Sequence, residues 1–281
     1  MKILILGSTG LLGSNLSINL RNSPHEIITH SYRAKNTDVS ADITCFETAE
    51  KILTKIAPNV VINLIALSDV DECERNPEKA YSLNVQSTKN ITSFIKKYEA
   101  NIRLIQISTD QVYNGKGQNS EDEINLLNNY AVTKHQSEKA ALDCNSIVLR
   151  TNFFGKSHNP QLASFSDWVI SSLDDEGIRF FDDIYFNPLH MDTLSSVILK
   201  ILDNKSAKGI YNVGSKDGMS KFEFADQIAR KMNLILDKQR SISIDEIDLS
   251  AQRPKSMITD VSKFENDFNF TLPNLKDEIE K

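Results

Sequence analysis

A tyrosine and a lysine four residues apart, Tyr130 and Lys134, have a spacing that can support chemistry. On a helix, side chains at this spacing share one face, so the lysine ammonium would lie beside the phenol. A neighbouring positive charge favours the phenolate and lowers the pKa of a phenol from its ordinary value of about 10. Such a phenol can exchange a proton with a carbonyl or an alcohol, so the pair predicts a proton donor with an assisting cation.

A second polar group lies about 20 residues upstream, where Ser108, Thr109 and Asp110 follow the apolar run Leu104–Ile107. In a sheet of parallel strands the carboxyl ends face the ligand crevice, so Thr109 could polarise a carbonyl oxygen beside Tyr130. The alternative is an exposed tyrosine–lysine pair on a helix and a polar cluster that only caps a turn. The glycine-rich turn near the start of the chain favours the catalytic interpretation.

This turn lies between an apolar run, Ile3–Leu6, and an amphipathic segment, Leu11–Leu20. A strand, a glycine turn and a helix in this order are typical of dinucleotide sites, where free N–H groups at the helix start hold the phosphates. Gly7 lets the chain turn sharply, Gly10 lets the backbone approach a pyrophosphate, and Gly13 lets the helix lie close to the sheet. The expected phosphate-binding residues are Gly7, Ser8, Thr9, Gly10, Leu11, Leu12 and Gly13.

The end of the second expected strand, Glu26–His30, indicates which nicotinamide cofactor is bound. A carboxylate there would bond the ribose 2′-hydroxyl of NAD, whereas a cation suits the 2′-phosphate of NADP. The run His30-Ser31-Tyr32-Arg33 contains no carboxylate, and the guanidinium of Arg33 can pair with a phosphate. We therefore predict NADP(H) as the preferred cofactor, with NAD(H) as the alternative. The remaining cofactor contacts are expected at Asp42, Ile43, Leu64, Ile65, Ala66, Tyr130 and Lys134.

Short apolar runs alternate with amphipathic segments through roughly the first half of the chain. This alternation predicts an α/β fold, a doubly wound parallel sheet covered by helices on both faces. The expected strands are Ile3–Leu6, Glu26–His30, Val60–Leu64, Leu104–Ile107 and Ile147–Leu149. The expected helices are Leu11–Leu20, Phe46–Ile56, a continuous helix over 77–97 and Asn129–Leu142.

After Arg150 the alternation weakens and loop-forming residues become more frequent. We expect a Rossmann domain at 1–155, completed by about 187–215, and a smaller, discontinuous substrate-binding domain at 156–186 and 216–281. Helices are expected at Ser164–Leu173, Asp192–Leu202 and 220–232, and strands at Ile178–Phe181 and Gly209–Val213.

Composition limits the classes of protein to which the chain can belong. The 281 residues carry a formal net charge of −6, so the chain lacks the basic footprint of a nucleic-acid-binding protein. The three cysteines and five histidines have no metal-ligand spacing, so we expect no metal site. The N-terminal residues do not resemble a signal peptide, and no apolar stretch is long enough to cross a bilayer. These features predict a cytoplasmic protein with no membrane partner.

Several runs resemble the extended short-chain dehydrogenase/reductase superfamily and, more narrowly, the dTDP-4-dehydrorhamnose reductases. They extend from the N-terminus almost to the C-terminus and include the glycine turn and the Tyr130–Lys134 pair. The narrower resemblance depends mainly on Ser108-Thr109-Asp110 with its trailing Gly115, and on Arg253-Pro254-Lys255-Ser256. The other runs are Ala66–Asp71, Asn76–Glu78, Asn84-Val85 and Leu149–Thr151.

The resemblance implies an NADP(H)-dependent reductase of a nucleotide-activated 4-keto-6-deoxy sugar that serves polysaccharide biosynthesis. Tyr130 would deliver the proton at the sugar C4, Lys134 would assist it, and Thr109 would hold the carbonyl. The guanidinium of Arg253 would lie near the nucleotide diphosphate, because its fork suits phosphate oxygens. The resemblance also allows for a homodimer. It places five residues at the sugar nucleotide: Val70, Asp71, Asp110, Trp168 and Arg253.

Gln111 distinguishes among related activities. Sugar-nucleotide 4,6-dehydratases carry a glutamate at this position because a carboxylate must remove the C5 proton, and an amide cannot act as that base. The reductases usually carry an aromatic residue there, so the glutamine leaves the sugar and the nucleotide open. Two alternatives remain: an epimerase that retains NAD, and a non-catalytic regulatory subunit like that of methionine adenosyltransferase, which resembles the same reductases.

Overall fold

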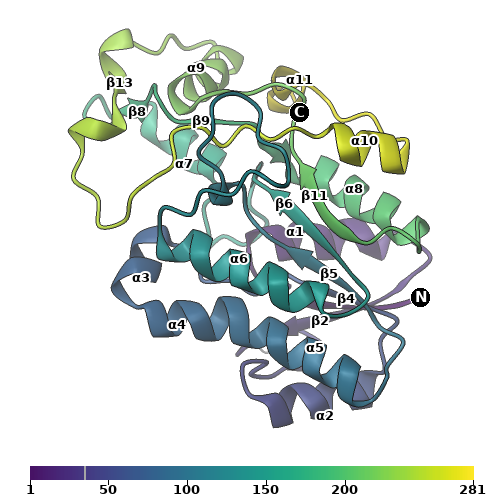
Figure 1. Cartoon of the computed structure of the whole chain (residues 1–281). Coiled ribbons are helices and arrows are strands. Elements are labelled where there is room, and N and C mark those ends of the chain that lie inside the picture. Colours follow the sequence, from purple (N-terminus) through teal and green to yellow (C-terminus); the bar gives the residue numbers. More distant parts are fainter. Residues whose placement is uncertain (35) are drawn as a thin grey trace.

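A seven-stranded parallel sheet forms the centre of the computed structural model, which describes residues 1–34 and 36–281 (Figure 1). The strand order is β11-β6-β5-β4-β1-β2-β3, so the chain winds outward in both directions from the β1–β4 pair. Such a reversal opens a crevice at the carboxyl ends of the strands. The predicted doubly wound α/β fold is confirmed. The strands are β1 (Lys2–Leu6), β2 (Glu26–Ser31), β3 (Val39–Ser40), β4 (Val60–Asn63), β5 (Arg103–Ile107), β6 (Ser146–Thr151) and β11 (Gly209–Val213).

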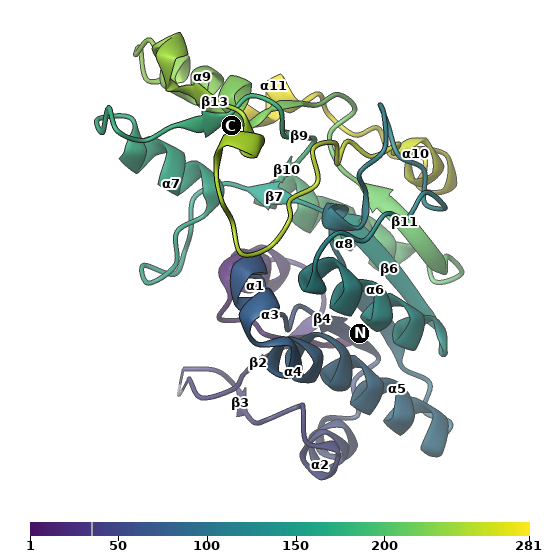
Figure 2. The same cartoon turned by 60° about the vertical axis from the view of Figure 1, so that its left-hand side comes forward.

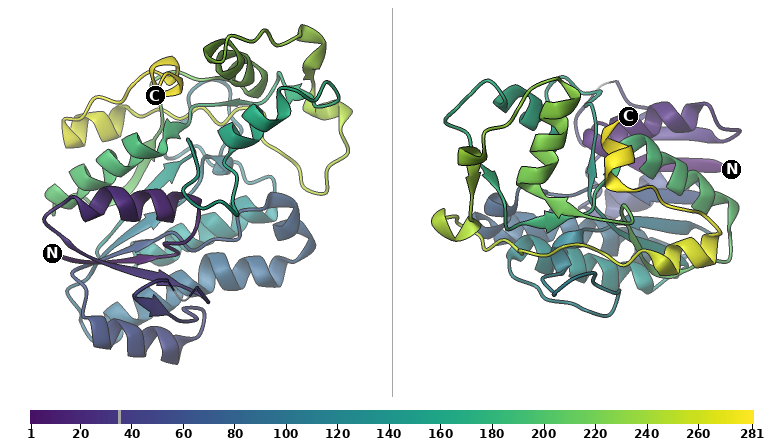
Figure 3. Two further views of the ribbon diagram at one scale, coloured as in Figure 1. Left: turned by 180° about the vertical axis from the view of Figure 1, so that it is seen from behind. Right: turned by 90° about the horizontal axis from the view of Figure 1, so that it is seen from above.

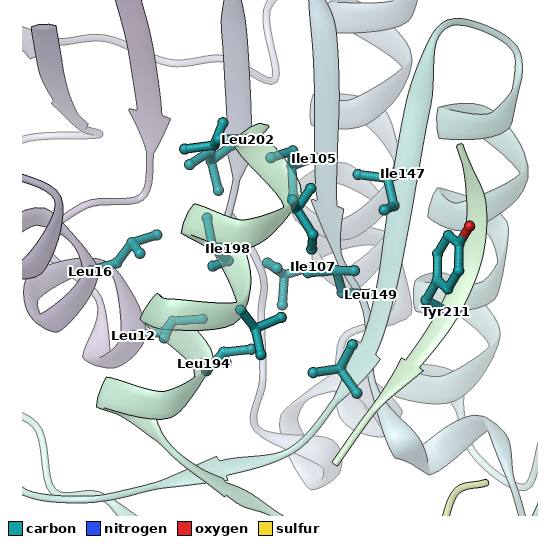
Figure 4. Close-up of a cluster of buried hydrophobic side chains, with 14 of the residues drawn as sticks. Leu12, Leu16, Ile105, Ile107, Ile147, Leu149, Leu194, Ile198, Leu202 and Tyr211 are labelled. Carbon is teal, nitrogen blue, oxygen red and sulfur yellow. The ribbon is translucent and has the colours of Figure 1, made fainter. Parts of the chain in front are cut away.

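Helices cover both faces of this sheet, and each face has its own apolar core. On one face, the core includes Leu16 and Ile198, which come from helices far apart in the sequence (Figure 4). Phe264 belongs to the same core. On the other, Leu53 and Ile91 pack against the strands. The continuously buried strands explain why the sequence shows apolar runs instead of alternation. The first face carries α1 (Leu11–Arg21), α8 (Met191–Asp203) and α10 (Ser262–Phe268); the second carries α2 (Phe46–Ile56), α5 (Ser87–Lys97) and α6 (Asn129–Leu142).

A third apolar core belongs to a smaller unit above the carboxyl ends of the strands, which we call the cap lobe (Figure 3). Phe224 packs there edge to face against Phe154 and Phe186. Phe165 meets Phe186 in the same way, and Phe180 lies edge to face with Trp168. Its elements are β7 (Phe153–Phe154), α7 (Phe165–Ser172), β8 (Phe180–Phe181), β9 (Tyr185–Phe186), β10 (Leu189–His190), β12 (Met219–Ser220), α9 (Lys221–Lys231), β13 (Ser241–Ile242) and α11 (Leu275–Ile279).

The C-terminal segment contributes to both units. Phe264, Phe268 and Leu272 lie in the core of the sheet, although we expected all of 216–281 in the substrate-binding domain. Leu275 and Ile279 return to the core of the cap lobe. The division into a nucleotide-binding and a substrate-binding domain remains a proposal, with 261–272 packed on the former.

The helix expected over 77–97 is interrupted. It consists of α4 (Pro77–Tyr81), a π-helical turn (Ser82–Gln86) and α5, preceded by α3 (Val70–Arg75). The turn holds the fully buried Asn84, whose Oδ1 accepts a bond from Leu67 N at 2.7 Å. Such turns are common at functional sites because they redirect one side chain without ending the helix. In the part of the chain that the structure describes, no helix is long and apolar enough to cross a membrane.

Candidate active site

Two cavities meet at the glycine turn, beside the carboxyl ends of β1 and β4. Their volumes are about 530 and 590 Å³, and both are lined by Gly7 and Gly10. They therefore form one crevice that passes over the turn. The first, the catalytic cavity, is also lined by Leu11, Leu12, Gly13, Thr109, Asp110, Gln111, Tyr130, Lys134 and Asn152. The second is also lined by Thr9, His30, Tyr32, Asp42, Ile43 and Ile65, and both include Leu64 and Ala66.

The start of α1 fits the phosphates of a dinucleotide. Its N-cap, Gly10, has no side chain to occupy the free N–H groups, and its first turn contains no acidic residue. By contrast, α7 and α9 each begin with a capping box that satisfies these groups internally. A Cβ at Gly13 would lie 2.3 Å from Gly7 O, so only glycine allows the helix this close to the turn. Gly7 has a φ of 79°, which also favours glycine.

Most of the expected cofactor residues line the crevice, but Ser8 and Arg33 lie outside the lining of both cavities. The hydroxyl of Ser8 donates to the carbonyl of His30 at 3.0 Å. The guanidinium of Arg33 stacks over the ring of Tyr32, 4.6 Å from its centroid, and both side chains are exposed. Since Tyr32 lines the second cavity, Arg33 stands at its rim.

The expected catalytic residues share the other cavity. Asn128 caps α6 by accepting a bond from Ala131 N at 2.8 Å, and Tyr130 lies in the first turn that follows. The ammonium of Lys134 is buried and donates to Ile107 O at 2.6 Å, just before Thr109. No contact of Asn84 was expected from the sequence, yet its amide donates to Thr133 Oγ1 at 2.9 Å, between the tyrosine and the lysine on α6. The π turn, which has no simple sequence pattern, accounts for this omission.

The ionisation of the pair differs from the expectation. Burial raises the pKa of Tyr130 above its ordinary value, and the contact with Thr109 only partly opposes this effect. Burial also lowers the pKa of Lys134 to about 8, although the charge of Glu138 acts in the opposite direction. The expectation was wrong because the Lys134 ammonium bonds the Ile107 carbonyl, and because the effect of burial on the pKa of each group is larger than the effect of the neighbouring charges. The phenol therefore keeps its proton at neutral pH, which suits a proton donor.

Asp110, which is buried, and Lys221, which is partly buried, add two ionisable groups that the proton-transfer pair does not require. Asp110 accepts a bond from Asn152 Nδ2 at 2.8 Å, and burial raises its pKa to about 6. Lys221, at the start of α9, places its ammonium 5.4 Å from the ring centroid of Phe165, and burial lowers its pKa to about 8. The charges of the two groups act on each other. The only sequence signal for Lys221 is a cation at a helix start, where the macrodipole disfavours it.

A strap over 247–255 leaves the cap lobe and reaches α3, as the yellow-green segment after β13 in Figure 2 shows. Asp71 accepts bonds from Arg253 Nη2 at 2.6 Å and from Ala251 N at 3.0 Å. The amide of Asn128 donates to Gln252 O at 2.8 Å, so the strap also touches the cap of α6. The structure thus pairs Asp71 with Arg253, both outside the lining of the catalytic cavity.

The other expected substrate residues are placed differently. Asp110 lines the catalytic cavity, whereas Val70 is buried at the start of α3 and Trp168 lies outside the lining. The Trp168 ring stacks on Phe165, with centroids 5.7 Å apart, and is 40% exposed. Gln111 does line the cavity, which places an amide where a dehydratase would need a base. Among the described residues, no group of three or more histidine, cysteine or acidic side chains could hold a metal ion.

Comparisons with known proteins agree with this geometry. Residues 1–281 match the model of the family described as RmlD substrate binding domain. A dTDP-4-dehydrorhamnose reductase from Escherichia coli is 29% identical, over 98% of this chain and 94% of its own length. Methionine adenosyltransferase 2 subunit beta from Rattus norvegicus is 27% identical, over 94% of this chain and 81% of its own.

Solved structures show the same architecture. A dTDP-4-dehydrorhamnose reductase from Clostridium acetobutylicum is 27% identical and superposes with a TM-score of 0.87, over 100% of this chain and 97% of that one. A second from Bacillus anthracis, in complex with NADP, has a TM-score of 0.88 over 99% and 97% of the two chains. Its 23% identity makes it evidence for the fold alone.

Proposed function

Because this chain belongs to the RmlD substrate binding domain family, we propose that it is the reductase of a nucleotide-activated 4-keto-6-deoxy sugar, with the chemistry of a dTDP-4-dehydrorhamnose reductase. It is an NAD(P)-dependent oxidoreductase of the short-chain dehydrogenase/reductase type. The observation that carries the proposal is the single cavity lined by Thr109, Tyr130 and Lys134, continuous with a glycine turn whose helix start is free.

Reduction converts the C4 carbonyl to an alcohol by adding a hydride to carbon and a proton to oxygen. A bound nicotinamide supplies the hydride. Tyr130 supplies the proton from its hydroxyl, which is protonated at neutral pH, and burial raises its pKa further above the ordinary value. The Thr109 hydroxyl, buried beside it, bonds the carbonyl oxygen and polarises it. The Lys134 ammonium stabilises the negative charge that the phenol acquires.

The crevice would hold the cofactor along its length. The nicotinamide end would lie in the catalytic cavity, the pyrophosphate at the free N–H groups of α1, and the adenosine in the cavity lined by Tyr32 and Asp42. Arg33 at the rim offers a guanidinium to a 2′-phosphate, so NADP(H) is preferred over NAD(H) in this proposal.

The sugar nucleotide would enter between the catalytic cavity and the strap. Asp110 would contact the sugar, with Val70, Asp71 and Trp168 around it. Arg253 would turn toward the diphosphate from its present pairing with Asp71. A homodimer and a cytoplasmic location complete the proposal, and light scattering on the purified protein would test the former.

The decisive experiment follows the absorbance of NADPH or NADH at 340 nm while the protein is mixed with a panel of nucleotide-linked 4-keto-6-deoxy sugars. We expect oxidation with at least one sugar, and faster with NADPH. No oxidation with any sugar would contradict the reductase and favour a regulatory subunit. Equal rates with both cofactors would contradict the role of Arg33. NAD released only by denaturation would favour the epimerase.

A matched pair of variants tests the rim residue. Arg33→Met should weaken NADPH binding about tenfold while leaving NADH binding nearly unchanged, because one phosphate contact is lost. Arg75→Met, an exposed arginine on α3 outside both cavities, is the control. A similar loss with both cofactors would assign Arg33 to folding instead of phosphate recognition.

A further inference from the structure

A fully buried glutamate, Glu138, lies directly behind the catalytic residues, one helical turn after Lys134. Its carboxylate accepts bonds from Ser108 Oγ at 2.5 Å and from Arg150 Nε and Nη2 at 2.9 and 2.8 Å. His135 Nδ1 lies 3.0 Å from it. Burial by itself raises the pKa of Glu138, but these partners outweigh burial and hold its pKa below the ordinary value. The carboxylate therefore remains ionised in the interior.

The bond from Ser108 links the Glu138 carboxylate to two catalytic residues, Thr109 and Lys134. Ser108 directly precedes Thr109 and directly follows Ile107, whose carbonyl accepts the ammonium of Lys134 at 2.6 Å. By accepting the bond from Ser108, Glu138 fixes the backbone at the end of β5. This backbone carries both the Ile107 carbonyl, which orients Lys134, and the Thr109 side chain. Its negative charge also acts on Lys134 and opposes the effect of burial on the ammonium.

Arg150 extends the network across the sheet. Its Nη1 donates to Tyr113 Oη at 2.7 Å and to Glu121 O at 2.6 Å. Two residues further along the chain, Asn152 bonds Asp110 in the catalytic cavity. One carboxylate therefore connects α6, β5 and β6 immediately behind the reacting groups.

We propose that Glu138 is a positioning residue, whose carboxylate holds Thr109 and Lys134 in register and sustains the positive charge of the Lys134 ammonium. The inference rests on the proposed reductase function. The competing interpretation is a buried ion pair that only stabilises the fold. Replacing such a pair by apolar residues is often neutral for stability, which provides a way to separate the two roles.

The first test does not depend on activity. The Lys134 ammonium is titrated by NMR in protein carrying ¹³Cε-labelled lysine, with Lys134→Met to assign its signal. In Glu138→Gln the pKa of Lys134 should fall by about one unit, because an opposite charge close to the ammonium is lost. In Glu138→Asp, which keeps the charge, the titration should stay close to that of the wild type. An unchanged titration in Glu138→Gln would overturn the proposal.

The second test uses kinetics. Glu138→Gln should lower kcat about 10- to 100-fold with KM changed no more than about threefold, since misplaced reacting groups slow the chemical step. The high-pH limit of kcat should move down with the pKa of Lys134. Glu123→Gln, an exposed glutamate bonded to Ser120, is the matched control and should behave like the wild type.

A double variant, Glu138→Leu with Arg150→Met, removes both charges and avoids leaving Arg150 unpaired. We expect its thermal stability to return toward that of the wild type while kcat and the Lys134 titration stay impaired. If kcat and the Lys134 titration also returned to their wild-type values, Glu138 would only stabilise the fold. If Glu138→Gln does not fold, the double variant gives the same two readouts. If the wild type reduces no sugar, the proposed function fails, while the titration still decides the role of Glu138.

Discussion

At the scale of single residues, Tyr130 is the proton donor on which the proposed mechanism depends. Tyr130→Phe removes the hydroxyl and keeps the ring, so we expect kcat to fall about 10²- to 10⁴-fold. The dissociation constant for NADPH, measured by fluorescence titration, should change less than about twofold. Tyr98→Phe, at an exposed position, is the control. Full activity of Tyr130→Phe would assign the proton to another group.

The Lys134 ammonium predicts a high-pH limit to turnover. Burial lowers its pKa to about 8, so the cation is present below that pH and is lost as pH rises through it. Turnover should therefore be highest near neutral pH, fall to about half near pH 8 and decline further above it. A pH profile of kcat checks this expectation. A profile that stays flat to pH 10 would mean that the charge on Lys134 is not needed.

The ionised carboxylate of Asp110 destabilises the folded state, because it is buried. Burial raises its pKa to about 6 from an unfolded value of 3.8, so the native state holds its proton more strongly than the unfolded chain. Below pH 3.8 both states are protonated and the cost vanishes, whereas above about pH 6 both are ionised and the full cost applies. Asp110→Asn should therefore raise the free energy of unfolding by about 1–3 kcal/mol at pH 8.

Denaturant unfolding of Asp110→Asn at two pH values tests this account. The gain seen at pH 8 should disappear at pH 4, where the wild-type carboxyl is largely protonated when folded. An equal gain at both values would point to a cause other than the charge. Because Asp110 lines the catalytic cavity, the variant should lose activity as it gains stability.

At the scale of elements, the close approach of α1 to the glycine turn depends on Gly13. In Gly13→Ala the added Cβ would meet Gly7 O and Ser8 Cα at 2.3 and 2.7 Å, which are backbone atoms that cannot move freely. We expect about 1–3 kcal/mol of lost stability from overpacking, and NADPH binding at least tenfold weaker. Gly177→Ala, which meets only the Asp175 side chain, is the control. Undiminished NADPH affinity would show that the turn does not hold the phosphates.

The strap over 247–255 predicts an effect on substrate binding. Arg253→Met removes both the pairing with Asp71 and the proposed contact with the diphosphate. KM for the sugar nucleotide should rise about 10- to 100-fold with kcat nearly unchanged, which is the signature of lost uniform binding. Asp71→Asn, which weakens the pairing but keeps the Arg253 guanidinium, should raise KM less. A fall in kcat with unchanged KM would instead place Arg253 near the reacting atoms.

The elements also show why parts of the site could be read from the sequence. The glycine turn and the Tyr130–Lys134 pair lie within single local segments, so spacing alone predicted them. Asn84 depends on a π turn that divides an apparently continuous helix. The pairing of Asp71 with Arg253 joins residues 182 apart in the chain, and such pairing follows from packing that no local pattern encodes.

At the scale of the whole molecule, the fold class was predictable because buried parallel strands leave continuous apolar runs. The position of the cap lobe over the crevice could not be predicted from the sequence. Lys221 comes close to Asp110 only when α9 docks above the sheet, and the C-terminal phenylalanines belong to the sheet and not to the cap lobe. Periodicity shows that a helix has an apolar face but does not identify its partner.

The late return of the chain to the sheet has a consequence for protein synthesis. Until β11 is made, β6 is an open edge, and until Phe264, Phe268 and Leu272 are made, one face of the sheet lacks part of its cover. The ribosome must therefore synthesise the chain through Leu272 before both faces of the sheet can be covered. A nonsense mutation before Leu272 should yield an aggregation-prone chaperone client and not a small NADP-binding fragment.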